Sequence, residues 1–149
     1  MKLSTNMWVA VLDGSKAIVM VNEGTALEPR LKVLHTLAQE NPPTHEQGRD
    51  RPGRLNDMSG QHRSSVEAPD LHQRAENAFI AEVMKALERD ANKGAFEKIV
   101  VAAPPVALGT LRREVGLALK PLIVKEIAAD YVKMPTQDIA RAVQRALEE

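Results

Sequence analysis

The stretch that decides the fold reads Met7-Trp-Val-Ala-Val-Leu-Asp-Gly-Ser-Lys-Ala-Ile-Val-Met-Val21. Its first apolar run ends at Asp13-Gly14, a dipeptide typical of tight hairpins because both central positions of a type I′ turn prefer a positive φ. A second run, Lys16 to Val21, supplies the partner strand. The segment therefore predicts a β-hairpin with its turn at Asp13-Gly14.

The chain that follows the hairpin predicts a third strand. A turn at Glu23-Gly24 leads to residues 31–38. Leu31, Val33 and Leu37 all fall on the same alternation of every second residue. Alternation with a period of two is the pattern of a strand that has one buried face. The first three strands should form an antiparallel meander.

Beyond residue 69 the apolar period changes from two to about 3.6, which indicates helix. Pro69 and Asp70 suit a first helical turn, so we expect a helix from about Pro69 to Asp90. Its apolar face recurs every four residues, at Leu71, Ala75, Phe79, Val83 and Leu87.

The remaining elements alternate between strand and helix. Ile99–Ala103 is a wholly apolar run, as expected of a central strand that is buried on both faces. We expect a helix over 106–120, a strand over 122–128, and a last helix from Pro135-Thr136 with Thr136 as its N-cap.

The resulting order, β-β-β-α-β-α-β-α, predicts a single α/β domain over residues 1–149. Three antiparallel strands followed by right-handed α/β units give a mixed five-stranded sheet with helices on its faces, the order found in ribonuclease-H-like folds. We expect the following apolar residues to build the core: Val9, Val11, Ile18, Val33, Phe79, Val83, Ile99, Val101, Leu111, Ile127, Ile139 and Val143.

A long interruption separates the meander from the first helix, at about 39–69. Segments of this length without secondary structure are uncommon in compact domains and are usually functional or disordered. We expect this one to be mobile, and it is either a solvated linker or the seat of function. Its cationic side chains are Arg49, Arg51, Arg54 and Arg63, with His62 beside them.

Composition limits the classes of function that remain. The 149-residue chain has no cysteine, which removes disulfides, thiolate nucleophiles and Cys-ligated metal sites. The formal net charge is zero, so contact with a nucleic acid would have to be local, and the Arg-bearing loop is the candidate. The N-terminal apolar run is too short for a signal sequence or a membrane span, so we expect a cytoplasmic protein without membrane contact.

Several motifs together resemble those of the bacterial host-attachment protein family. The resemblance covers nearly the whole chain, and the family name implies a role in attachment to host cells. The motifs are Trp8-Val-Ala-Val-Leu-Asp-Gly-Ser-Lys-Ala17, Gly53-Arg54, Ser59-Gly-Gln-His-Arg63, Ala103-Pro-Pro-Val-Ala-Leu-Gly-Thr-Leu-Arg112 and Ala129-Asp130.

That family is similar to the central domain of archaeal and eukaryotic peptide-chain release factors, in which a loop carries Gly-Gly-Gln. Here the loop reads Ser59-Gly60-Gln61, so a serine replaces the first glycine and reduces backbone freedom. The resemblance implies that Gln61 could position water for ester hydrolysis through its backbone N–H and its side-chain amide, in a site supplied largely by ribosomal RNA. It also implies a ribosome or tRNA partner, bound through Arg49, Arg51, Arg54, Ser59, Gly60, His62 and Arg63.

Other interpretations stay open beside this one. The protein could bind RNA without hydrolysis, or act as a non-enzymatic protein-interaction module linked to attachment. A metal-dependent nuclease is a minor alternative, because Asp13 suits the hairpin turn better than a metal site, and the four histidines are scattered. We therefore expect no metal and no cofactor.

Arg112 is a further candidate for contact with a partner. It stands on the helix that follows the central strand 99–103, at the end of the sheet where α/β proteins tend to bind ligands. The sequence does not indicate an oligomeric state.

Overall fold

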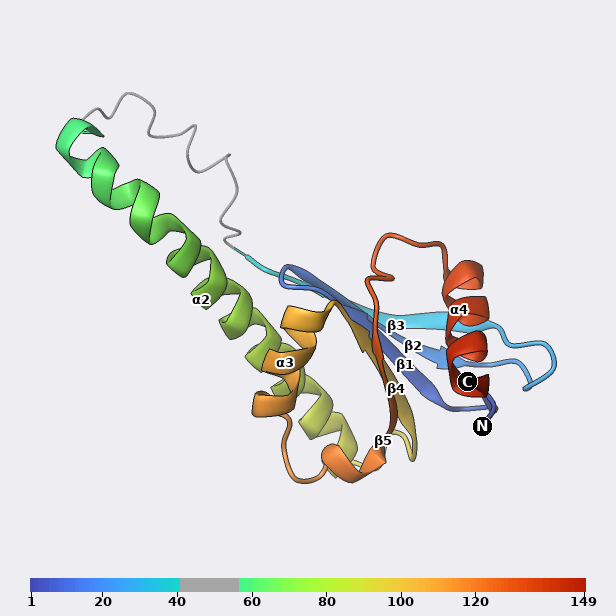
Figure 1. Ribbon diagram of the computed structural model, residues 1–149. Helices are drawn as coiled ribbons and strands as arrows, with labels where there is room; N and C mark the ends of the chain where they lie inside the picture. Colours follow the sequence, from blue (N-terminus) through green and yellow to red (C-terminus); the bar gives the residue numbers. More distant parts are fainter. Residues whose placement is uncertain (41–56) are drawn as a thin grey trace.

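The computed structural model describes the backbone of residues 1–40 and 57–149 and the side chains of residues 1–40 and 70–149. It shows a five-stranded sheet with helices on both faces (Figure 1). The elements, in chain order, are β1 (Trp8–Leu12), β2 (Lys16–Asn22), β3 (Leu31–Ala38), α2 (Asp57–Asn92), β4 (Ile99–Ala103), α3 (Pro105–Glu114), a 3-10 turn at Lys120–Leu122, β5 (Ile123–Ala128) and α4 (Thr136–Glu148).

The strand order is β3-β2-β1-β4-β5, with β1 in the centre. β1 and β2 pair antiparallel, as do β2 and β3, whereas β1 and β4 pair parallel, as do β4 and β5. The predicted α/β class and mixed five-stranded sheet are confirmed. The likeness to ribonuclease-H-like folds stays a prediction, as does the mobility of the loop, much of which lies at 41–56, outside the described residues.

The first hairpin forms where the sequence predicts it, but its turn is held differently. The Asp13 carboxylate accepts hydrogen bonds from the backbone N–H groups of Ser15 and Lys16, each at 2.8 Å. Gly14 does not have a positive φ, so the expected type I′ geometry is wrong. The glycine is needed for space instead, because a Cβ at this position would lie 2.6 Å from the side chain of Glu76 on α2.

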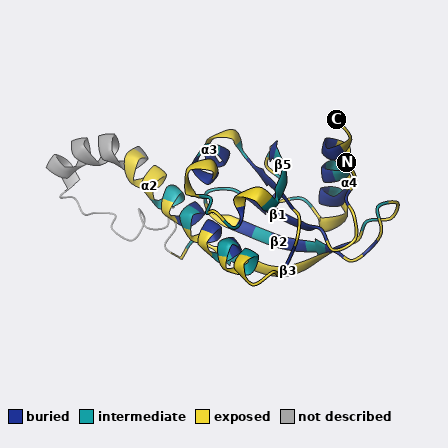
Figure 2. Ribbon diagram, turned by 90° about the horizontal axis from the view of Figure 1, so that it is seen from below, coloured by how far each residue is buried: buried dark blue, intermediate teal, exposed yellow. Residues whose placement is uncertain are grey.

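Two apolar layers cover the two faces of the sheet. One contains Trp8, Val19 and Val101 and packs under α2 and α3, whereas the other contains Val9, Val11 and Val100 and packs under α4. Figure 2 shows the central strands buried and much of β3 exposed.

Ten of the twelve predicted core residues are buried. Ile18 is only partly buried, and Val33 is 41% exposed, so the prediction for Val33 is wrong. Val33 lies on β3, an edge strand of the sheet, where alternation of apolar residues does not guarantee a covering helix.

Helix boundaries differ from the prediction in three places. α2 begins at Asp57 rather than about Pro69, so residues 57–69 are helical and the predicted loop is too long. Pro69 misled the prediction because proline usually marks the first turn of a helix, and here it lies within one. α3 ends at Glu114, earlier than the predicted end at residue 120, because the backbone is extended at Val115. The N-cap of α4 is Pro135 rather than Thr136.

One buried polar side chain ties the N-terminal segment to the sheet. Asn22 is fully buried, and its side-chain amide donates to the carbonyl groups of Leu3 and Ser4. Its side-chain oxygen accepts from the backbone N–H groups of Gly24 and Arg30, at 2.9 and 2.8 Å. The β2–β3 connection and the segment before β1 are therefore fixed by one residue.

Among the helices that the structure describes, none combines the length and the apolar character needed to cross a membrane.

Candidate functional site

The structure places the predicted loop residues in two groups. Arg49, Arg51 and Arg54 fall within 41–56, outside the described residues. Ser59, Gly60, Gln61, His62 and Arg63 belong to the first turns of α2, where the backbone is described and the side chains are not. The cationic part of the sequence therefore leads directly into the N-terminal end of the longest helix.

α2 runs past the edge of the sheet (Figure 1). Residues 70–74 are exposed, Glu76 lies beside Gly14 of the hairpin turn, and Phe79 is the first buried residue of the described part of the helix. At a rise of 1.5 Å per residue, the helix extends about 28 Å from Glu76 to its first residue, Asp57. Residues 57–63 therefore form the first turns of a projecting helix.

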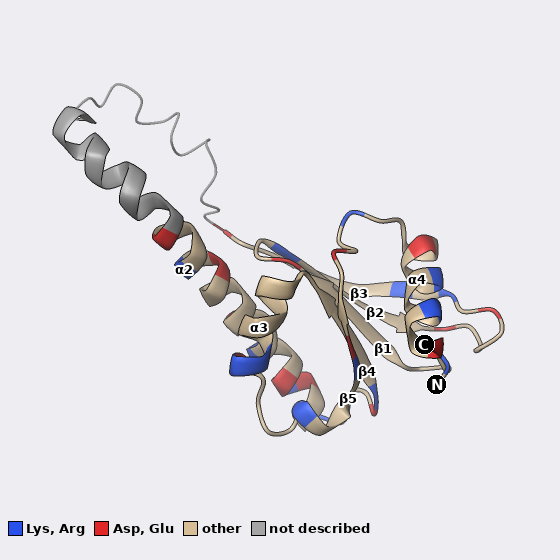
Figure 3. Ribbon diagram, in the orientation of Figure 1, with Lys and Arg blue, Asp and Glu red and all other residues tan. Residues whose placement is uncertain are grey.

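Charge is distributed unevenly along this arm. Acidic and basic side chains are interspersed along the described part of α2, as Figure 3 shows. Upstream, residues 49–63 contain four arginines and two aspartates. The sequence that leads into α2 therefore has a local excess of positive charge, although the whole chain is neutral.

The helical conformation determines whether the backbone N–H of Gln61 is free to take part in a reaction. It is the fifth residue of α2, so its backbone N–H lies where it donates to the carbonyl of Asp57, four residues earlier. In this conformation the backbone N–H is not free to position water.

Arg112 does not join the loop residues. It lies on α3, and Thr110 of the same helix donates a hydrogen bond to the side chain of Asn77 on α2 at 3.0 Å. Asn77 is sixteen residues beyond Gln61, which corresponds to about 24 Å along the helix axis. Arg112 and Gln61 therefore belong to different surfaces.

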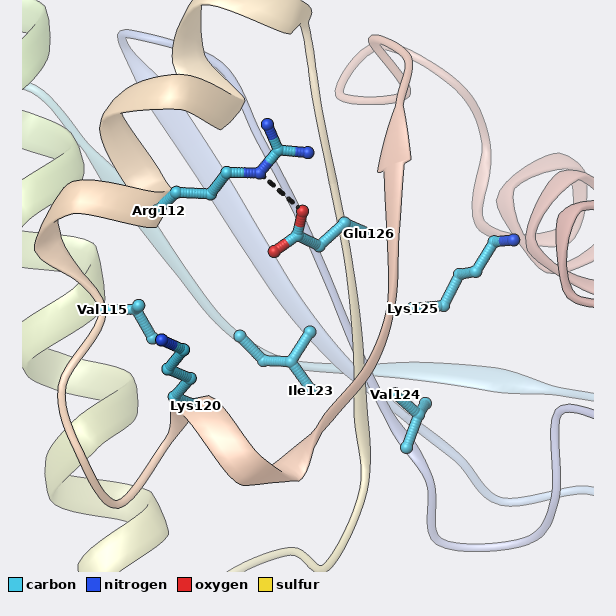
Figure 4. Close-up of a pocket in the computed structure, with 7 residues that line it drawn as sticks. All are labelled: Arg112, Val115, Lys120, Ile123, Val124, Lys125 and Glu126. Carbon is cyan, nitrogen blue, oxygen red and sulfur yellow. Dashed lines mark hydrogen bonds and ion pairs between the residues drawn. The ribbon is translucent and has the colours of Figure 1, made fainter.

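Arg112 forms one wall of a groove along the outer edge of β5 (Figure 4). Its Nε donates to the Glu126 carboxylate at 2.8 Å, and both side chains are partly exposed to solvent. The groove has a volume of about 600 Å³ and is also lined by Val115, Lys120, Ile123, Val124 and Lys125. The edge thus combines a satisfied ion pair, two lysines and a strip of aliphatic side chains.

The connection between α3 and β5 is held in place by a residue that the sequence did not single out. The Glu88 carboxylate on α2 accepts hydrogen bonds from the backbone N–H groups of Ala118 and Leu119, each at 2.9 Å. A Cβ on Gly116 would come within 2.4 Å of this carboxylate, so only glycine leaves room for it. The sequence did not indicate this pairing, because Glu88 and Gly116 are far apart in the chain.

The acidic residues considered for a nuclease are not gathered into a metal site. Within residues 1–40 and 70–149, no three histidine, aspartate or glutamate side chains lie close enough to hold a metal ion. The Asp13 carboxylate caps the first turn, and the Asp130 carboxylate accepts from the Val132 N–H at 3.3 Å. Both carboxylates have local structural partners.

Comparison with known proteins places the chain in a family. The model of bacterial archaeo-eukaryotic release factor family 12 matches residues 6–143, so the chain belongs to that family. The predicted similarity to release factors is confirmed at this level, and attachment to host cells stays a prediction.

Individual relatives are more distant. An uncharacterized protein of Rickettsia prowazekii is 36% identical over 63 residues, which is 41% of this chain and 42% of that protein. Among solved structures, the archaeal translation termination factor aRF1 has a TM-score of 0.48 at 15% identity, over 95% of this chain and 39% of that one. Dom34 of S. cerevisiae, a translation termination-like factor, has a TM-score of 0.37 at 11% identity, over 96% of this chain and 37% of its own. The chain therefore spans less than half the length of each.

Proposed function

We propose that this member of bacterial archaeo-eukaryotic release factor family 12 binds ribosomal RNA or tRNA in the cytoplasm and does so through residues 49–63. The observation that carries the proposal is the projection of α2 past the edge of the sheet (Figure 1), because the helix begins about 28 Å before Glu76, which lies beside the hairpin turn. An arm of this kind can bring a small basic segment into an RNA-walled channel while the bulky sheet stays outside.

The chemistry of the segment supports an RNA partner. Arginine guanidinium groups donate bidentate hydrogen bonds to phosphate oxygens and stack on unpaired bases. Arg49, Arg51, Arg54 and Arg63 provide four such groups within a short stretch of chain. The whole chain is neutral and this stretch has two more arginines than aspartates, so the rest of the chain has a formal net charge of −2. Affinity for RNA should therefore depend on this stretch and not on the whole surface.

Ribosome co-sedimentation tests the proposal. The wild-type protein is compared with a variant in which the four loop arginines are replaced by glutamine, and with a control in which four exposed arginines on other parts of the surface, Arg30, Arg89, Arg141 and Arg145, are replaced in the same way. The loop variant should no longer sediment with ribosomes, whereas the control variant should still do so. If both variants still sediment with the ribosome, the segment 49–63 does not make the contact.

Salt dependence provides a second readout with purified RNA. Each arginine that contacts a phosphate adds about 0.7–0.9 to the slope of log affinity against log salt concentration, so the loop variant should lose up to about 3 units of slope. The control variant should keep the wild-type slope. An unchanged slope in the loop variant would place the contact elsewhere, with Arg112 as the next residue to test.

Peptide release is a second candidate activity, and the Gly60-Gln61 pair favours it. Because Gln61 lies in a helical turn, its side-chain amide would position the water, or the first turn of α2 would unwind on the ribosome and free the backbone N–H. If the side-chain amide positions the water, Gln61→Ala should leave ribosome binding intact and abolish hydrolysis of peptidyl-tRNA, because it removes only a transition-state contact.

Ser59→Gly is the complementary variant. Restoration of Gly-Gly-Gln should increase release if backbone freedom at this position limits the reaction. If neither the wild-type protein nor Ser59→Gly releases peptide from stalled ribosomes, the arm binds RNA without chemistry. If the protein also fails to bind ribosomes, a protein-interaction role such as attachment becomes the better hypothesis.

A further inference from the structure

The outer edge of β5 is an open strand edge. β5 pairs only with β4, and within the described part of the chain no other strand lies beside it. Alternate backbone N–H and C=O groups of an edge strand point outward and can pair with another extended chain. Here that edge opens into the groove between α3 and β5.

Side chains that line the groove lie on both faces of the strand. Ile123 and Glu126 are in register with Ile99 and Val101, whose side chains lie on the face covered by α2 and α3. Lys125 is in register with Val100, on the α4 face. Figure 4 accordingly shows Lys125 pointing away from Arg112 and Lys120.

Each face therefore presents both a cation and an aliphatic surface. The α3 face has Lys120 beside Val115 and Ile123, and its other cation, Arg112, is paired with Glu126. The α4 face has Lys125 and Val124. An extended chain points successive side chains to opposite faces, so a bound strand would meet positive charge on both.

We propose that the β5 edge binds an extended acidic segment of a partner protein, which adds to the sheet as a further strand. Main-chain hydrogen bonds to β5 would provide affinity, and acidic side chains placed near Lys120 and Lys125 would provide selectivity. The groove favours peptide over RNA, because its lining has no aromatic side chain on which a base could stack. This site is separate from the arm that begins at residue 57 and does not depend on it.

The wall of the groove is held in position before any partner binds. Val115 and Lys120 flank the connection whose backbone is anchored to the Glu88 carboxylate through Ala118 and Leu119. Leu119 itself is fully buried in the core. A preorganised site of this kind loses little conformational entropy on binding.

The test measures binding of a fluorescein-labelled peptide, Glu-Glu-Val-Val-Glu-Glu-Val-Val, to the full chain by fluorescence polarisation. In this sequence each face of the extended peptide carries both glutamate and valine. The double variant Lys120→Glu/Lys125→Glu should weaken binding at least about tenfold, because like charges then face each other. The matched control Lys2→Glu/Lys93→Glu changes two exposed lysines on other parts of the surface and should bind as the wild type does.

Further measurements make the proposal refutable. A peptide with N-methylated backbone amides should not bind, since it cannot pair with the strand edge, and amide NMR shifts should move along β5. Equal binding of the methylated peptide, equal binding of a Lys-for-Glu peptide, or no binding of the original peptide would overturn the proposal. Amide NMR shifts along β5 on addition of single-stranded RNA would assign the edge to RNA instead. Self-association that Lys120→Glu/Lys125→Glu abolishes would assign it to a second copy of the chain.

Discussion

Removal of the Glu88 carboxylate should loosen the connection between α3 and β5 and with it one wall of the groove. Glu88→Ala deletes two hydrogen bonds of 2.9 Å, from the backbone N–H groups of Ala118 and Leu119. Hydrogen bonds to a charged group contribute about 1.5–3 kcal/mol each. Glu88 is only half-buried, and water can partly replace it, so we expect the free energy of unfolding to fall by about 2–4 kcal/mol.

Glu88→Gln is the more discriminating substitution. The amide keeps one oxygen acceptor but turns an N–H₂ donor toward a backbone N–H, so the loss should be roughly half of that caused by alanine. Urea denaturation followed by circular dichroism measures both losses of unfolding free energy. A change in the urea concentration at the midpoint, without a change in the m value, identifies an effect on stability. Glu82→Ala, at an exposed position on the same helix, is the control and should change the unfolding free energy by no more than about 0.5 kcal/mol. A loss below about 1 kcal/mol for Glu88→Ala would refute the anchoring role.

Three further substitutions test the fold. Asn22→Ala should cost about 2–6 kcal/mol in unfolding free energy, because the fully buried hydrogen bonds to the Leu3 carbonyl and from the Gly24 N–H lose their partner; a thermal shift of the variant within error of wild type would contradict this. Phe79→Ala should cost about 3–5 kcal/mol in urea denaturation, since Phe79 is only 4% exposed, and a loss below about 1 kcal/mol would place it outside the core. Val33→Thr, at a position 41% exposed on the edge strand, should change stability by less than about 0.5 kcal/mol, and a larger loss would show that its side chain is covered.

Sequence periodicity was sufficient to predict the bounds of two strands. β3 and β4 begin and end where the pattern predicts, because apolar alternation and a wholly apolar run are local signals. The exposure of Val33 was not predictable in the same way, since it depends on β3 being at the edge of the sheet. An edge position is a property of the whole topology.

The candidate sites were less accessible from sequence than the fold. The start of α2 was misplaced because proline is a strong boundary signal, and the apolar period that reveals a helix requires a buried face. The ion pair of Arg112 with Glu126 and the anchoring by Glu88 join residues that are distant in the chain.

The central position of β1 has a consequence for the order in which the molecule folds. Its antiparallel partner β2 follows after a short turn, whereas its parallel partner is reached about ninety residues later, where Trp8 pairs with Ile99. Local pairs form fast and distant pairs form slowly, because the intervening chain must first be closed into a loop. We expect the β1–β2–β3 meander to form first and the pairing of β1 with β4 to limit the rate. Insertions within 41–56 should then slow folding only slightly, since doubling the length of a closed loop costs about 0.6 kcal/mol.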